Sequence, residues 1–161
     1  MAYFNDLLVP DDGTATAFTR FTSAAEYGLG EERTTKDGKT YRYVQFKDAV
    51  TYVAGHVCTP ANTSWTAVTN DVAGGSSVAA TTFAGIALAA VTQNYYGWVQ
   101  IGGVATVVGD GSVAADEAVV VHSTDGQADT MAAGEEHLIF GRALEADSGS
   151  PASFLCLLER N

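Results

Sequence analysis

The sequence predicts an all-β fold: a small barrel or sandwich of short antiparallel strands with an internal pseudo-repeat and an N-terminal arm. Runs of roughly five to eight β-forming residues recur between Asp-Gly, Gly-Gly and Ser-Gly turns, and no long segment has helical periodicity. One pattern of strand, polar turn and strand also occurs twice, 56 positions apart. Gly85 to Ala90 aligns with Gly141 to Ala146, and Trp98 to Ile101 aligns with Phe154 to Leu157. Chance similarity among glycine-rich and alanine-rich strands is the alternative explanation of this alignment.

Size and charge narrow the function classes. A chain of 161 residues is long enough to bury roughly 70% of its unfolded surface without a disulfide or a metal. The net charge of -11 disfavours nucleic acid and anionic membranes as partners, because both repel an acidic surface. Six of the eight basic residues fall within residues 1–47, so the N-terminal third is best suited to meet another acidic surface.

Residues 1–30 are predicted to form the arm. They show no strand alternation and include the turn cluster Pro10 to Gly13, although Phe18, Phe21 and Ala25 have the spacing of a short helical turn. Large apolar side chains are too frequent here for a solvated tail. We therefore expect the chain's own β domain or a neighbouring subunit to cover them.

Residues 31–161 are predicted to form a single β domain with pseudo-repeat units at about 55–101 and 116–157. Its first element is a hairpin over Glu31 to Phe46 that turns at Asp37-Gly38, a pair that tolerates the positive φ of tight turns. Further strands are expected at 49–59 (broken by Gly55), 65–68, 83–91, 98–101, 104–108, 117–123, 138–144 and 154–159. Cys58 and Cys156 lie among apolar residues, which favours buried free thiols.

No sequence motif indicates catalysis, so we expect neither an enzyme nor a cofactor. The chain lacks a Gly-x-Ser-x-Gly elbow and a Walker loop, and its glycine pairs fall between strands rather than before a helix. His56, His122 and His137 are isolated in sequence, so a metal site is not expected. A calcium site and an acidic surface turn are both open for five carboxylates: Asp110, Asp116, Glu117, Asp125 and Asp129.

The order of motifs resembles that of the small β-rich decoration (cement) proteins of tailed-bacteriophage heads. The motifs are YRYVQF, AV-x-x-V-A-G-H-V, FAGIALAAVT, YYGWVQIGGVATV, GSVAADEAVVV, DGQADT, IFGRALEA and SFLCLLE, and the resemblance covers roughly residues 40–161. It implies a non-enzymatic virion protein, made in the host cytoplasm, that binds the outer capsid surface as a trimer. The implied partners are the major capsid protein and other copies of the chain.

Two sets of candidate contact residues follow. The arm and the basic hairpin are expected to contact the capsid through Phe4, Leu7, Leu8, Phe18, Phe21, Arg33, Lys36, Lys39, Arg42 and Lys47. Tyr95, Tyr96 and Trp98 are expected to form an oligomer or ligand surface. The latter residues also support an alternative function, a carbohydrate-binding or receptor-binding β module of a phage particle.

Overall fold

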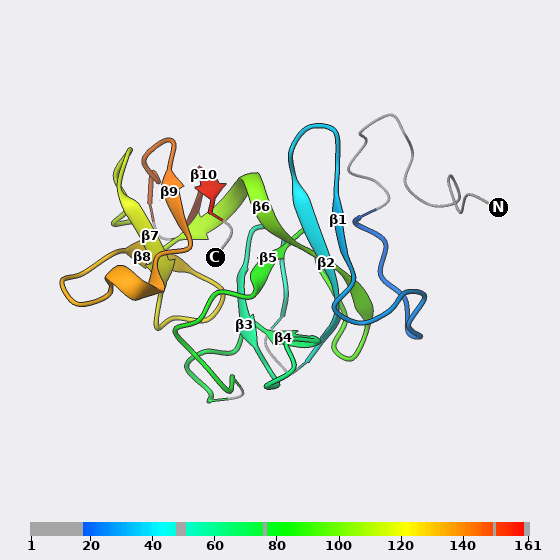
Figure 1. Cartoon of the computed structure of the whole chain (residues 1–161). Helices are drawn as coiled ribbons and strands as arrows, with labels where there is room; N and C mark the ends of the chain where they lie inside the picture. The colour runs from blue at the N-terminus through cyan, green and yellow to red at the C-terminus, as the bar shows by residue number, and fades with distance from the viewer. Residues whose placement is uncertain (1–17, 48–50, 76, 150, 160–161) are drawn as a thin grey trace.

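The computed structural model of the chain describes residues 18–47, 51–75, 77–149 and 151–159. This part of the chain contains short strands and one 3-10 turn (Figure 1). The elements are β1 (Glu32–Thr34), β2 (Thr40–Phe46), β3 (Val57–Pro60), β4 (Ala67–Thr69), β5 (Gly85–Ala87), β6 (Tyr96–Gly109), β7 (Ala118–Val121), β8 (Ala128–Thr130), η2 (Glu136–Leu138), β9 (Gly141–Ala143) and β10 (Ala152–Leu158). The all-β prediction is confirmed.

The strands form two small barrels that share β6. One ten-stranded sheet has the order β1-β2-β4-β3-β5-β6-β10-β9-β7-β8, and two further pairings, β2 with β6 and β6 with β8, return it onto itself. The first pairing closes β2, β4, β3, β5 and β6 into a ring, and the second closes β6, β10, β9, β7 and β8 into another. We call these rings the first and second barrel. In Figure 1, β7 to β9 lie on the left and β1 to β5 lie towards the centre and right.

Both barrels use the same pairing pattern. In the first, β3 is antiparallel to β4 and β5, β5 is antiparallel to β6, and β2 is parallel to β4. In the second, β7 is antiparallel to β8 and β9, β9 is antiparallel to β10, and β6 is parallel to β8. The expectation of antiparallel strands alone is therefore wrong at two pairs. The parallel pairs arise because β4 inserts between β2 and β3, and β8 inserts between β6 and β7.

The longest strand, β6, merges two strands that the sequence predicted separately. Gly102 and Gly103 suggested an interruption, but the strand continues through them to Gly109. Gly103 has a φ of 80°, and a Cβ there would lie 2.9 Å from the carbonyl oxygen of Gly38, so a glycine fits this bend. The buried Gln100 side chain donates hydrogen bonds to the carbonyl oxygens of Gly102 and Val104, both at 3.0 Å. These bonds satisfy the carbonyls at the bend.

Each barrel has its own apolar core. The first core contains Val44, Phe46, Tyr52, Cys58, Val68, Ala84, Ala87, Val91, Val99 and Ile101. The second contains Val57, Ile86, Ala105, Val107, Val113, Val119, Val121, Ala128, Phe140, Ala143, Phe154, Cys156 and Leu158. Val57 and Ile86 belong to strands of the first barrel but pack in the second core, so β3 and β5 join the two barrels.

Residues 18–30 cover the outside of the first barrel. Phe18 is 3% exposed, and its ring stacks on Tyr41 with centroids 3.9 Å apart. Thr22 pairs with Tyr96 through two backbone hydrogen bonds of 3.0 and 2.8 Å. The predicted helical turn is wrong, because this pairing extends the backbone at Thr22. The described end of the predicted arm is thus covered by the chain's own barrel.

Candidate functional site

The basic side chains of the predicted capsid-contact hairpin are largely engaged by neighbouring carboxylates. Arg33 donates through Nε and Nη2 to Glu31 Oε1 at 2.9 and 2.7 Å. Arg42 does the same to Glu32 Oε1 at 3.1 and 2.8 Å. Lys39 Nζ lies 3.8 Å from Asp37, which lowers the positive field of the hairpin tip. Such exposed pairs contribute little stability, but they locally offset charge.

The predicted capsid-contact residues do not lie together on one surface. Phe4, Leu7 and Leu8 lie outside the described residues. Phe18 is buried, and Phe21 packs edge-on against Phe46 with centroids 5.4 Å apart. These two phenylalanines therefore serve the chain's own fold. Lys36 lies at the hairpin turn, and Lys47 Nζ lies 3.5 Å from Asn94 Oδ1 at the opposite end of β2.

The aromatic set is not an exposed platform. Trp98 is 4% exposed and forms a third cluster with Phe18, Tyr41 and Tyr43 beneath residues 18–30. Arg33 also lies over the Trp98 ring, 5.3 Å from its centroid. Tyr95 and Tyr96 are only partly buried. Sequence reasoning missed that the N-terminal segment folds over Trp98, since no local pattern marks this long-range contact.

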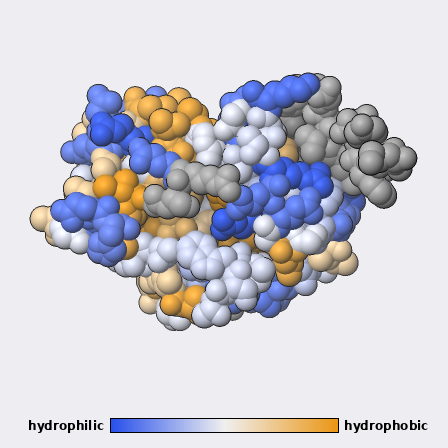
Figure 2. All heavy atoms as spheres, in the orientation of Figure 1, coloured by the Kyte–Doolittle hydropathy of each residue, from blue (hydrophilic) through white to orange (hydrophobic). Residues whose placement is uncertain are grey.

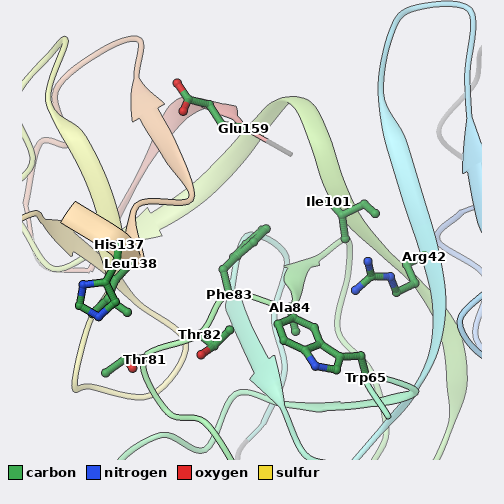
Figure 3. Close-up of a pocket in the computed structure, with 10 residues that line it drawn as sticks. All are labelled: Arg42, Trp65, Thr81, Thr82, Phe83, Ala84, Ile101, His137, Leu138 and Glu159. Atoms are coloured by element: carbon green, nitrogen blue, oxygen red, sulfur yellow. The ribbon is translucent and has the colours of Figure 1, made fainter. Parts of the chain in front are cut away.

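The described residues include a cleft where the two barrels meet (Figure 3). Its volume is about 150 Å³. Residues from both barrels line it: Arg42, Trp65, Thr81, Thr82, Phe83, Ala84, Ile101, His137, Leu138 and Glu159. Phe83, which lines the cleft, stacks on Phe140 of the second core with centroids 4.4 Å apart. Figure 3 shows Trp65 on one side of the space and His137 with Leu138 on the other.

Trp65 is the exposed aromatic of the cleft. It is 38% exposed and has a φ of 59°, in the left-handed region that bulky residues rarely adopt. The side chain of Asn62 holds the turn, because its Oδ1 accepts from the backbone amides of Thr66 and Ala67 at 3.1 and 3.3 Å. Arg42 lies 5.9 Å from the centre of the Trp65 ring. The strand predicted at 65–68 starts only at Ala67, since Trp65 belongs to this turn.

Asp110, His122 and Asp129 meet although they are distant in sequence, and they are the described group with metal-ligand potential. His122 Nδ1 accepts a 2.9 Å hydrogen bond from the backbone amide of Thr124, so the proton of the neutral ring lies on Nε2. That nitrogen lies 3.9 Å from Asp110 and 3.8 Å from Asp129. A protonated Nε2 cannot ligate a metal, and this arrangement favours an N–H directed at two carboxylates.

Two of the other predicted calcium ligands, Asp125 and Glu117, hold nearby loops. Asp125 Oδ1 accepts from the backbone amides of Val72 and Ala73, both at 2.7 Å. Glu117 Oε2 accepts from the Ala114 amide at 3.0 Å and the Thr130 hydroxyl at 2.8 Å, and these bonds lower its pKa. Carboxylates that accept local backbone donors hold loops in place. The five acids therefore do not form one site.

An apolar patch lies on the outer face of β6 and β10 and the end of β9. It comprises Val104, Leu144, Leu155 and Leu157, each between 39 and 46% exposed. Leu157 is paired in register with Val104 on β6, and the Leu144 amide donates to the Leu155 carbonyl at 2.7 Å, so these side chains are neighbours across strands. The exposed Arg142 on β9 is paired with Leu157 and borders the patch there. Figure 2 shows hydrophobic residues gathered at the end of the molecule where β9 and β10 lie. An open groove of about 420 Å³, lined by residues that include Tyr41, Leu88 and Leu155, adjoins it.

No helix in the described part of the chain has the length and apolarity needed to cross a membrane. No family model matches the sequence, and no curated protein matches it. Among solved structures, the fold is similar to the N base of the head fiber gp8.5 of bacteriophage phi29. The TM-score is 0.51 at 12% sequence identity, and the match covers 76% of this chain and 96% of that chain.

Proposed function

We propose that the chain is a non-enzymatic structural protein of a bacteriophage head, which binds the outer capsid surface, stabilises the capsid and associates as a homotrimer. The observation that carries the proposal is the similarity of fold to a head fiber base, since almost all of that base is matched. Fold alone does not determine function. Further support comes from two features of the surface, the apolar patch and the basic hairpin tip.

The apolar patch supports self-association. Exposed leucines and valines cost free energy in water, and burial of the remaining exposed part of each is worth roughly half of the 1.5–3 kcal/mol of a whole side chain. The four apolar residues of the patch carry no charge, while the protein as a whole carries -11. Copies that meet through this face would therefore remove its exposed apolar area from water. A three-fold ring would join the patch to a different surface of the next copy.

The capsid contact is proposed for the N-terminal residues and the hairpin tip. Phe4, Leu7 and Leu8 supply apolar side chains, and Lys36 and Lys39 supply positive charge at the turn. Phe18 and Phe21 are not included in this proposed contact, because they pack against the first barrel. Weak contacts repeated over a capsid lattice add through avidity, so each contact can be modest.

The test combines light scattering with binding to phage heads stripped of their outer proteins. The wild-type protein is expected to have the mass of three chains and to bind the heads saturably. A Leu155→Ser/Leu157→Ser variant is expected to be monomeric, whereas Val78→Ser, which changes an exposed valine outside the patch, is expected to remain trimeric. A stable wild-type monomer that ignores the heads would overturn the proposal.

The capsid contact is tested separately by deletion of residues 1–17. This deletion leaves residues 18–30 over Trp98, so the barrel keeps its cover. The truncated protein is expected to stay folded but to lose head binding, and Lys36→Gln/Lys39→Gln is expected to weaken it in a salt-dependent way. Arg20→Gln changes an exposed cation elsewhere and is expected to bind normally. Full occupancy by the truncated protein would exclude the N-terminal contact.

A further inference from the structure

Trp65 combines a strained backbone conformation with an indole ring that is exposed to solvent. A left-handed conformation is unfavourable at a residue of this size and persists only where the surroundings enforce it. The Asn62 amide enforces it here, with the two accepted bonds described above and a further 2.9 Å bond from its Nδ2 to the Thr66 hydroxyl. The indole joins neither barrel core, and the Arg42 guanidinium 5.9 Å from its ring centre is already bound to Glu32. The turn is therefore built to hold Trp65 at the cleft.

The cleft is large enough for one six-membered ring. A volume of about 150 Å³ is comparable to that of a cavity that accepts a single six-membered ring such as benzene. One wall presents the indole of Trp65, and the polar side chains of Thr82 and His137 lie across the space from it (Figure 3). A few polar groups around an aromatic surface fix the orientation of a small ligand. A ligand that matches needs an apolar face and hydroxyl groups along its edge, which is the chemistry of a pyranose.

Charge in and around the cleft selects between neutral and anionic sugars. The guanidinium of Arg42 is bound through two donors to Glu32, which offsets its positive charge. Glu159 adds an exposed carboxylate at the rim, and the whole chain carries -11. An anionic sugar or a phosphate would meet repulsion here.

We propose that the cleft between the two barrels binds one neutral pyranose ring stacked on Trp65, with hydrogen bonds to side chains at the rim. This site replaces the Tyr95, Tyr96 and Trp98 platform that the sequence suggested. It does not depend on the capsid function. On a particle that carries many copies, such single-ring sites would add through avidity on a glycan-covered surface.

The experiment follows the indole N–H signals of the full chain by two-dimensional NMR. The chain has two tryptophans, so a Trp65→Phe variant assigns both signals. The probes are the methyl glycosides of glucose, galactose and mannose, N-acetylglucosamine and N-acetylgalactosamine, with glucuronic acid as the anionic comparison. At least one neutral sugar is expected to shift the Trp65 signal saturably at millimolar concentration and to leave the buried Trp98 signal unchanged.

Two variants keep the test independent of folding. Trp65→Ala is expected to weaken binding roughly tenfold, in line with loss of an aromatic contact, as followed by the His137 ring signals. Trp65→Asn places a residue that tolerates the left-handed backbone, so it is expected to melt no lower than wild type and still to lose binding. Val78→Ala, outside the cleft, is expected to bind normally.

Three results would overturn the inference. The first is that no neutral sugar of the panel shifts the Trp65 signal. The second is that Trp65→Asn binds as tightly as wild type. The third is that glucuronic acid binds more tightly than methyl glucoside, which would contradict the selection by charge.

Discussion

Phe21 lies directly against Gly97, so that a Cβ built on Gly97 would stand 2.2 Å from Cδ1 of the phenylalanine ring. The absence of a side chain at this point of β6 is what lets residues 18–30 approach the first barrel. The contact lies beside the Thr22 and Tyr96 backbone pair, which fastens the same segment.

We predict that Gly97→Ala displaces the segment and costs about 1–3 kcal/mol, as overpacking usually does. Hydrogen exchange at the Thr22 amide is expected to accelerate, because its bond to Tyr96 is lost with the segment. Gly149→Ala is the control, since nothing lies within 4 Å of a Cβ at that position. Unchanged protection of the Thr22 amide would show that Phe21 can move aside without loss of the backbone pair.

Gly85 and Gly141 occupy corresponding positions at the start of β5 and β9, and both are closely approached by the next strand. A Cβ on Gly85 would lie 2.5 Å from a methyl group of Val99, and one on Gly141 would lie 2.6 Å from the carbonyl oxygen of Leu157. We predict that alanine at either position lowers the free energy of unfolding by about 1–3 kcal/mol. Urea denaturation measures this, again with Gly149→Ala as control. At Gly141 the clash is with a ladder carbonyl that cannot rotate away, whereas at Gly85 the φ of 154° adds backbone strain to the clash with Val99.

His56 is predicted to make stability depend on pH near neutrality. Burial lowers the pKa of its imidazole below the ordinary 6.5, and the charge of Asp125 opposes this only in part. Its Nδ1 also lies 2.9 Å from the Asn70 side-chain amide, which donates to the neutral ring. Below about pH 6.5 the unfolded chain therefore binds a proton that the folded chain does not, so stability falls as the pH drops towards the lowered pKa.

Urea midpoints between about pH 7.5 and pH 5 measure this slope. His56→Gln removes the titrating group and is expected to flatten it. The carboxylates Asp110 and Glu117 are not expected to contribute in this window. Their pKa values are held below the ordinary range, so their share of stability is lost only at more acidic pH. An unchanged slope in His56→Gln would assign the effect to another group.

The two thiols are predicted to be inert in the folded protein and to become reactive together. Cys58 lies in the first core and Cys156 in the second, and burial raises the pKa of each to about 12. Ellman's reagent at about pH 8 is therefore expected to label neither thiol natively and both after denaturation. In low urea, Cys58→Ala and Cys156→Ala isolate the labelling rate of the remaining thiol. We expect equal labelling rates. Strand β6 belongs to both barrels, so the opening of one barrel is expected to open the other.

Local chemistry in the sequence indicated much of the fold. Asp37-Gly38 marked the first hairpin, and the alignment of Gly85 with Gly141 identified two positions that the structure explains by close approach of a neighbouring strand. The continuity of β6 was not predictable in this way. Gly102-Gly103 resembles an interruption locally, and only pairing with β2 before the bend and with β10 after it keeps the strand extended.

The candidate sites depended still more on distant residues. Trp98 and Trp65 both stand near polar turns in the sequence, yet residues 18–30 cover one while a strained turn exposes the other. Likewise, Asp110 and Asp129 meet because β6 and β8 pair in parallel, and the antiparallel pairing of β7 with β8 brings His122 beside them. Such contacts follow from topology, which residue spacing does not reveal.

The shared strand also determines how the molecule responds to mechanical force. Strand β6 is hydrogen-bonded along its first half to β2 and along its second half to β10, and both partners run antiparallel to it. Tension applied along β6 is thus spread over many ladder bonds in shear, and these must fail nearly together, whereas bonds pulled at a sheet edge peel apart singly. Strain applied to one barrel would thus pass to the other through this one continuous, bent strand.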